Sequence, residues 1–148
     1  MVTVGFVLIL WNRKGLIMRP LVPEIIMISA DIESNLPESN KLLQEVIEIV
    51  FEKRGIKYIP AMGCYNGKVE QSFMIDAKHI SDALALAIRF NQESILYRDK
   101  MGECSLIYLD ESRSPMYIGL WTEITESQAQ YQDHTLIDNR YFTTRRFA

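Results

Sequence analysis

The chain has 148 residues, of which 48% are hydrophobic and 24% charged, so its composition excludes a disordered chain and suits one globular domain. Its net charge is −3, and Lys and Arg do not cluster before residues 140–146, which argues against a nucleic-acid partner. The apolar run over residues 4–11 is too short to cross a bilayer and follows no basic stretch. We therefore expect no membrane partner and a cytoplasmic location.

Residues 1–23 are interpreted as a leader or an extra edge segment, and residues 24–148 as a single α+β domain. The apolar run Glu24–Ala30 predicts a central strand, which a polar loop follows. A helix is expected from Glu38 to Arg54, and Gly55 ends it. The apolar stripe of this helix is predicted to consist of Leu42, Leu43, Val46, Ile49, Val50 and Phe51.

A hairpin is the strongest local prediction. The strands are Lys57–Tyr65 and Val69–Asp76, and Asn66-Gly67 between them is typical of a type I′ turn, which needs two residues that tolerate positive φ. Such a turn brings the Tyr65 hydroxyl and the Glu70 carboxylate into one neighbourhood. This pair either binds and shapes a small molecule, or it is an ordinary cross-strand pair that stabilises the hairpin.

A second helix is expected to begin at Asp76 and to fade at Asn91-Gln92. Three further strands are predicted, over Glu93–Tyr97, Cys104–Leu109 and Met116–Ile124, whereas residues 125–148 carry no clear pattern. The first six elements follow the order of a ferredoxin-like βαββαβ core. We therefore predict an α+β fold in which one antiparallel sheet carries two helices on one face, with extra C-terminal strands.

Two helices cover only one face of such a sheet, yet several predicted strands are apolar on both faces. The second face must then be covered by the C-terminal segment, by the N-terminal segment or by another subunit, and we expect a homo-oligomer. The two cysteines, Cys64 and Cys104, are interpreted as reduced thiols and not as metal ligands, and no metal site is predicted. His79 and His134 have no evident partner and are expected to face solvent.

Three segments together carry a resemblance to a known family. They are Ile28-Ser29-Ala30 with Ser34-Asn35-Leu36, then Gly63-Cys64-Tyr65 with Glu70, and then Ala83–Ala87 followed by Asn91–Tyr97. In this order and spacing they resemble the small phage S-adenosylmethionine lyases, formerly called hydrolases. The turn that joins Tyr65 to Glu70 is shorter here than in that family.

The resemblance implies cleavage of S-adenosylmethionine into methylthioadenosine and homoserine lactone, with an anti-restriction role for a phage. The substrate's own carboxylate attacks its γ-carbon, so no cofactor is implied. Tyr65 and Glu70 are the implied catalytic residues, with Tyr65 orienting the reacting end and Glu70 binding the ammonium or ribose. Ser29, Asn35, Gln92 and Glu93 are candidate substrate contacts. A trimer with sites between its subunits is the candidate assembly.

Other functions remain open at this point. Glu70 acting as a general base on water would give homoserine instead of the lactone. A non-enzymatic interaction or ligand-binding module of the same fold is the main alternative, and it predicts that Tyr65 and Glu70 do not converge on a pocket. A methyltransferase is disfavoured, because no glycine-rich loop follows a strand and no alternating βαβα pattern is present.

Overall fold

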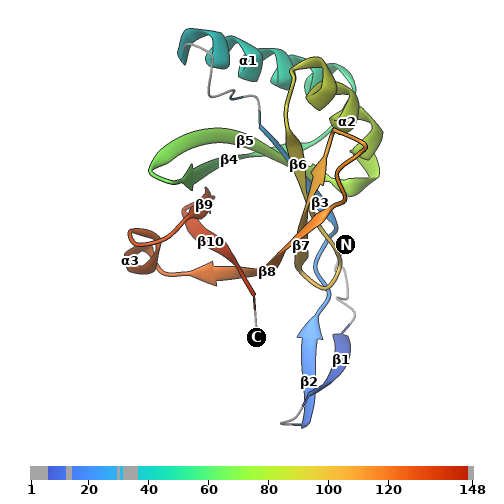
Figure 1. Ribbon diagram of the computed structural model, residues 1–148, viewed down its shortest axis with the longest axis vertical. Coiled ribbons are helices and arrows are strands. Elements are labelled where there is room, and N and C mark those ends of the chain that lie inside the picture. The colour runs from blue at the N-terminus through green and yellow to red at the C-terminus, as the bar shows by residue number, and fades with distance from the viewer. Residues whose placement is uncertain (1–6, 13–14, 30, 32–36, 147–148) are drawn as a thin grey trace.

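The computed structural model describes residues 7–12, 15–29, 31 and 37–146. Two strands at the N-terminus, β1 (Val7–Asn12) and β2 (Gly15–Pro20), pair only with each other. They form a ribbon that projects from the rest of the molecule (Figure 1). Among the described residues, no helix is both long and apolar enough to span a membrane.

The remaining strands close on themselves. Eight antiparallel strands follow one another around the ring in the order β10-β8-β7-β6-β3-β5-β4-β9, and β9 pairs with β10 to complete it. Their bounds are β3 Ile25–Ser29, β4 Tyr58–Tyr65, β5 Lys68–Asp76, β6 Ser94–Arg98, β7 Glu103–Tyr108, β8 Met116–Ile124, β9 His134–Ile137 and β10 Arg140–Arg145. The helical elements are α1 Pro37–Lys53, the short 3₁₀ helix η1 Ala77–His79, α2 Ile80–Arg89 and α3 Glu126–Ala129.

The predicted ferredoxin-like α+β fold is wrong, because the sheet is a closed barrel and not an open layer. The order of the elements from β3 to β6 does follow βαββαβ, and β6-β3-β5-β4 form half of the ring. The other half comes from β7 and β8, which the sequence predicts, and from β9 and β10, which lie in the segment without a clear sequence pattern. These strands cover the second face of the first half, so closure within one chain removes the need for a partner there.

The segment that follows β8 contains two local signals, a helix cap and a hairpin turn. Thr125 caps α3 in a reciprocal capping box with Gln128. Asp138 and Asn139 both have positive φ, at 48° and 61°, which gives a two-residue turn of the type that joins hairpin strands. The β9–β10 hairpin therefore rests on the same turn chemistry as the β4–β5 hairpin.

Two cores lie on opposite sides of the barrel wall, and strand β3 contributes to both. Ile26 and Ile28 face outward and pack under α1 and α2, whereas Ile25 and Met27 face the barrel interior. The outer core is made by Ile47, Phe51, Ile56, Phe73, Ile75, Ala83, Leu86, Ala87 and Ile95, together with Ile26 and Ile28. In the interior, Ala61 and Ile137 complete the buried cluster, and Trp121 stacks on Phe142 at 5.2 Å between ring centroids. Figure 1 shows both helices together on the outer side of the ring.

The apolar face of helix α1 is only partly buried. Leu43, Ile47, Val50 and Phe51 face the outer core. Leu42 and Ile49 are instead exposed, at 61% and 50%, and Val46 is exposed as well. The predicted stripe is therefore buried only in part: Leu42, Val46 and Ile49 form its exposed flank, and the fully buried Ile47 belongs to its inner part.

Candidate functional site

The β4–β5 hairpin forms with the predicted turn. Asn66 and Gly67 have φ values of 52° and 76°, and Tyr65 pairs with Lys68 across the two-residue turn. Gly63 lies opposite Glu70 in the same register. Residues two apart on a strand share a face, so Tyr65, Gly63 and Glu70 all lie on one face of the hairpin, with Tyr65 and Glu70 as diagonal neighbours.

The Tyr65 ring packs directly over the backbone of Gly63. A Cβ atom on Gly63 would lie 2.5 Å from Cε2 of Tyr65, so only glycine leaves room for the ring in this position. The Tyr65 hydroxyl reaches the next strand, where it lies 3.1 Å from Oγ1 of the buried Thr135 on β9. Thr135 on β9 pairs with Gly63 on β4, so the Tyr65 side chain extends over Gly63 and its hydroxyl lies on β9.

The environment of the phenol keeps it protonated. Burial of the hydroxyl raises the pKa of Tyr65, the hydrogen bond with Thr135 lowers it, and the negative charge of Glu70 raises it further. The net direction is upward, away from neutral pH. The residue as a whole is 39% exposed, while its hydroxyl lies against the buried Thr135 in the barrel wall. Tyr65 is therefore a hydrogen-bond donor and not a base at neutral pH.

Two hollows meet at Tyr65 and Glu70. One is a small cavity of about 130 Å³ in the end of the barrel, which Ser29, Ser72, Ser94 and the interior apolar side chains Met27, Leu96 and Leu106 also line. The other is an outer groove of about 710 Å³ between the hairpin tip and the start of α1, which Asp31, Asn40, Asn66, Lys68 and Val69 also line. The larger volume falls within the range of ordinary small-molecule sites. Tyr65 and Glu70 thus lie between a polar outer groove and a small cavity in the end of the barrel, and line both.

Ser29 contributes through a network at the end of β3. Its hydroxyl donates to the carbonyl of Gln71 at 3.0 Å and accepts from the backbone N–H of Asp31 at 3.1 Å. The Asp31 carboxylate in turn accepts from the backbone N–H of Gln71 at 2.9 Å and from Nε2 of Gln44 at 2.5 Å. These bonds tie β3, β5 and α1 together beside Glu70. Asn35 lies outside the described residues.

Comparison with known proteins gives one family. The model of the S-adenosylmethionine lyase family matches residues 26–145, which span the chain from β3 to β10. The chain belongs to this family. No curated protein matches the chain. A lyase that acts on S-adenosylmethionine is the function that membership of this family indicates.

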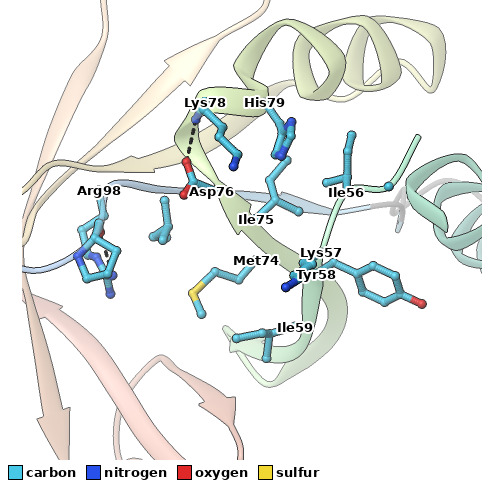
Figure 2. Close-up of a pocket in the computed structure, with 13 residues that line it drawn as sticks. Ile56, Lys57, Tyr58, Ile59, Met74, Ile75, Asp76, Lys78, His79 and Arg98 are labelled. Carbon is cyan, nitrogen blue, oxygen red and sulfur yellow. Dashed lines mark hydrogen bonds between the residues drawn. The ribbon is translucent and has the colours of Figure 1, made fainter. Parts of the chain in front are cut away.

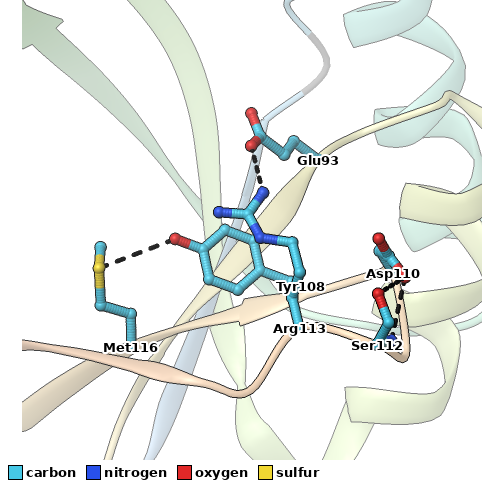
Figure 3. Close-up of polar contacts among 6 residues, drawn as sticks. All are labelled: Glu93, Tyr108, Asp110, Ser112, Arg113 and Met116. Carbon is cyan, nitrogen blue, oxygen red and sulfur yellow. Dashed lines mark hydrogen bonds and ion pairs between the residues drawn. The ribbon is translucent and has the colours of Figure 1, made fainter.

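In this member of the S-adenosylmethionine lyase family, Gln92 and Glu93 lie apart from Tyr65 and Glu70. Glu93 points outward and pairs with Arg113 at 2.8 Å, and the Arg113 guanidinium stacks 3.6 Å above the Tyr108 ring (Figure 3). Gln92 packs at the end of α2, where its backbone N–H donates to Ala87 at 2.9 Å. Neither residue lines the two hollows, whereas the adjacent Ser94 does. Their predicted contact with substrate stays a prediction.

Several residues at the site were absent from the predicted set. Thr135 holds the Tyr65 hydroxyl, and Asp31 holds the backbone next to Glu70. Thr135 lies in the segment without a sequence pattern, and only barrel closure brings it to β4. Asp31 had a usable signal, because an acidic residue directly after a buried strand is well placed to bind backbone N–H groups.

Neither the thiols nor the imidazoles line the two hollows at Tyr65 and Glu70. Cys64 and Cys104 are both free, as predicted, and burial raises the pKa of the Cys104 thiol to about 12. The prediction that both histidines face solvent is only partly right, because His79 and His134 are half-buried. Within the described residues, no three His, Cys, Asp or Glu side chains lie close enough together to share a metal ion.

Proposed function

We propose that this protein cleaves S-adenosylmethionine into methylthioadenosine and homoserine lactone at the Tyr65–Glu70 site. A carboxylate oxygen of the substrate forms a bond to its γ-carbon, the bond from that carbon to sulfur breaks, and the electron pair leaves with sulfur as a neutral thioether. Nucleophile and leaving group both belong to the substrate. The reaction as proposed therefore needs no cofactor and no proton transfer in this step.

The observation that carries the proposal is the convergence of Tyr65 and Glu70 on one cavity in a chain of this family. A binding module that merely uses the fold has no need to bring these two side chains to a shared hollow. The outer groove has room for the nucleoside, and the small cavity continues into an apolar barrel interior. Apolar surroundings favour a step in which a carboxylate and a sulfonium lose their charges together, because water stabilises the charged ground state more.

The roles of the two residues follow from what changes during the reaction. The ammonium group of the substrate keeps its charge throughout, so Glu70 binds it, or the ribose hydroxyls, equally well before and during the reaction and fixes the conformation. The protonated Tyr65 donates to the reacting end and orients it. Holding an intramolecular attack in line is worth up to about 7–11 kcal/mol in the best model systems. Positioning therefore supplies most of the rate in this proposal.

The biological role in the proposal is anti-restriction. A phage-encoded enzyme of this kind, acting in the cytoplasm of its host, removes the methyl donor that restriction–modification systems require.

The first test is product analysis in ¹⁸O-labelled water. The proposed reaction gives methylthioadenosine and a lactone that contains no ¹⁸O, and slow opening of the lactone then places label in the carboxylate. Attack by water activated by Glu70 instead places ¹⁸O in the hydroxyl of homoserine from the start. Intact S-adenosylmethionine after incubation with the folded protein would reject the enzymatic proposal and favour the binding module.

The second test assigns the two residues. We expect Tyr65→Phe and Glu70→Gln each to lower kcat/KM by about 10²–10³-fold, the range for losing one well-placed polar contact to a reacting centre. Tyr131→Phe and Glu111→Gln are matched controls on exposed positions. Turnover that survives both site variants would show that the chemistry lies elsewhere.

A homo-oligomer with sites between subunits, such as a trimer, is part of the proposal. Its support is the outward stripe of α1, where Leu42, Val46 and Ile49 repeat at helical spacing and remain exposed. We expect sedimentation velocity to show an oligomer that Ile49→Glu converts to a folded monomer, whereas Glu45→Gln on an exposed position of the same helix leaves it intact. A wild-type monomer at micromolar concentration would contradict this part of the proposal.

A further inference from the structure

The barrel has a second open end, opposite the Tyr65–Glu70 site. β4 begins there with Tyr58 and Ile59 and ends at Tyr65, so the two ends lie about 20 Å apart along the strand. β6 runs the other way and ends at Arg98. Ser94 at one end and Arg98 at the other share the inner face of this strand, so Arg98 lies at the second opening.

Arg98 is buried, and no carboxylate among the described residues pairs with it. Only 8% of the residue is exposed. Its NH2 atom donates to the carbonyl of Pro23 at 2.9 Å, and its guanidinium lies 5.7 Å from the centre of the Trp121 ring. Its Nε has no hydrogen-bond partner in the described part of the chain, and no ion pair joins it to a described carboxylate. A guanidinium stays charged even when burial lowers its pKa, so this donor remains open to an anion.

Arg98 lines a cavity of about 900 Å³ (Figure 2). Ile25, Ile59 and Met74 give the cavity an apolar wall, and Figure 2 shows Met74 between Arg98 and Lys57. Lys57 and Lys78 also line the cavity. One carboxylate, Asp76, also lines the cavity, but its Oδ1 accepts from the backbone N–H of Lys78 at 2.8 Å and so caps η1. Cations therefore outnumber anions around an apolar hollow.

We propose that this cavity is a second ligand site, which binds a small molecule with an anionic head and an apolar body. The carboxylate or phosphoryl head pairs with Arg98 and accepts from Nε, and the body packs on Ile25, Ile59 and Met74. Lys57 and Lys78 add long-range attraction. Charge-assisted hydrogen bonds to a buried guanidinium are stronger than neutral ones, so the head supplies most of the specificity. The site is separate from the one that acts on S-adenosylmethionine.

The test uses phenyl phosphate, benzoate and benzyl alcohol as probes, followed by NMR on ¹⁵N-labelled protein. Phenyl phosphate and benzoate are expected to shift the Nε–H resonance of Arg98, and each is expected to bind at least tenfold more tightly than neutral benzyl alcohol. A preference for phenyl phosphate points to phosphorylated ligands, and a preference for benzoate points to carboxylic acids. Equal binding of all three probes would overturn the proposal.

Substitutions test which residues contribute to the binding of phenyl phosphate in this cavity. Arg98→Met keeps the length and removes the charge, and we expect it to weaken phenyl phosphate binding roughly tenfold or more. Lys78→Gln is expected to weaken it about twofold to threefold, which keeps the test valid if Arg98→Met fails to fold. Arg89→Gln on exposed α2 is the matched control, and Tyr65→Phe should leave binding unchanged. Unchanged binding in both Arg98→Met and Lys78→Gln would overturn the proposal whatever the outcome with S-adenosylmethionine.

Discussion

The Tyr65 phenol is positioned by backbone pairing and not by a loop. Its ring rests on Gly63, its hydroxyl meets Thr135, and these two residues are themselves partners across β4 and β9. Glu70 is paired with Gly63 from the other side. Because three adjacent strands share these contacts, a displacement of the phenol requires a change in the barrel wall. The site is therefore as rigid as the sheet that carries it.

Burial of the Tyr65 hydroxyl makes stability depend on alkaline pH. In the unfolded chain the phenol loses its proton near pH 10, whereas the folded chain, in which the pKa is raised, still holds it. The contribution of this burial is fully present below about pH 10 and is lost as pH rises through the folded pKa. Between about pH 9 and 11, the free energy of unfolding should therefore fall more steeply in the wild type than in Tyr65→Phe, as measured by urea denaturation. Tyr131→Phe, at an exposed position, should follow the wild type, and parallel curves for all three would contradict the assignment.

Sequence reasoning reached the Tyr65–Glu70 pair because a two-residue turn is a local signal. The contact of Glu93 with substrate stays a prediction, and in the structure Glu93 precedes β6 and pairs with Arg113, whereas Ser94, the first residue of β6, lines the small cavity. The role of Thr135 could not be predicted from the sequence, because its contact with Tyr65 joins residues that are 70 positions apart. Residues held by local turns were predictable, and residues brought together by closure were not.

Among the elements, the two hairpins and helix α1 show where patterning is strong and where it is ambiguous. Asn66-Gly67 gave the first hairpin correctly, and Asp138-Asn139 carried a comparable signal that its short, polar surroundings obscured. In α1, apolar residues form one broad face, of which one part is buried and the adjoining part is exposed. Only the packing shows that Ile47 and Phe51 are buried and that Leu42 and Ile49 are exposed.

Two glycines of the hairpin should respond differently to alanine. At Gly67 the φ of 76° is unfavourable for alanine but space is open, so Gly67→Ala should cost about 1 kcal/mol of stability while activity persists below the melting temperature. At Gly63 the new Cβ meets the Tyr65 ring, so Gly63→Ala should lose activity out of proportion to stability. Thermal denaturation and kcat/KM on both variants check this, with Asn66→Gly as the neutral control. Equal loss of activity in the two alanine variants would contradict it.

The architecture of the whole molecule depends on the pairing of the C-terminal strands with strands earlier in the chain. Four strands in a ferredoxin-like order would form an open sheet, but β9 pairs with β4 and β10 pairs with β8, and the ring closes. Helix propensity and strand alternation do not report such pairings, because both describe neighbours in the sequence. The element order was therefore accessible from the sequence, whereas the architecture was not.

Closure makes the C-terminal strands essential for stability. Phe142 on β10 stacks on Trp121 inside the barrel, so Phe142→Ala should lower the free energy of unfolding by about 2–3 kcal/mol. Phe142→Leu, which keeps most of the volume, should cost roughly half as much. Denaturant titration of both variants provides the measurement. A loss of less than about 0.5 kcal/mol in Phe142→Ala would mean that β10 contributes little to the interior.

The register of the β4–β5 hairpin depends on whether residues are added to both of its strands or to one of them. Gly63 stays opposite Glu70 when one residue is added to each strand beyond Tyr65 and Lys68, because each added pair only moves the turn outward. A single added residue in one strand instead shifts every later side chain to the other face, unless a bulge absorbs it. A hairpin that is longer by an even number of residues, added equally to both strands, thus keeps the same side chains on the same face. The short Asn66-Gly67 turn is therefore compatible with the same site that a longer hairpin would carry.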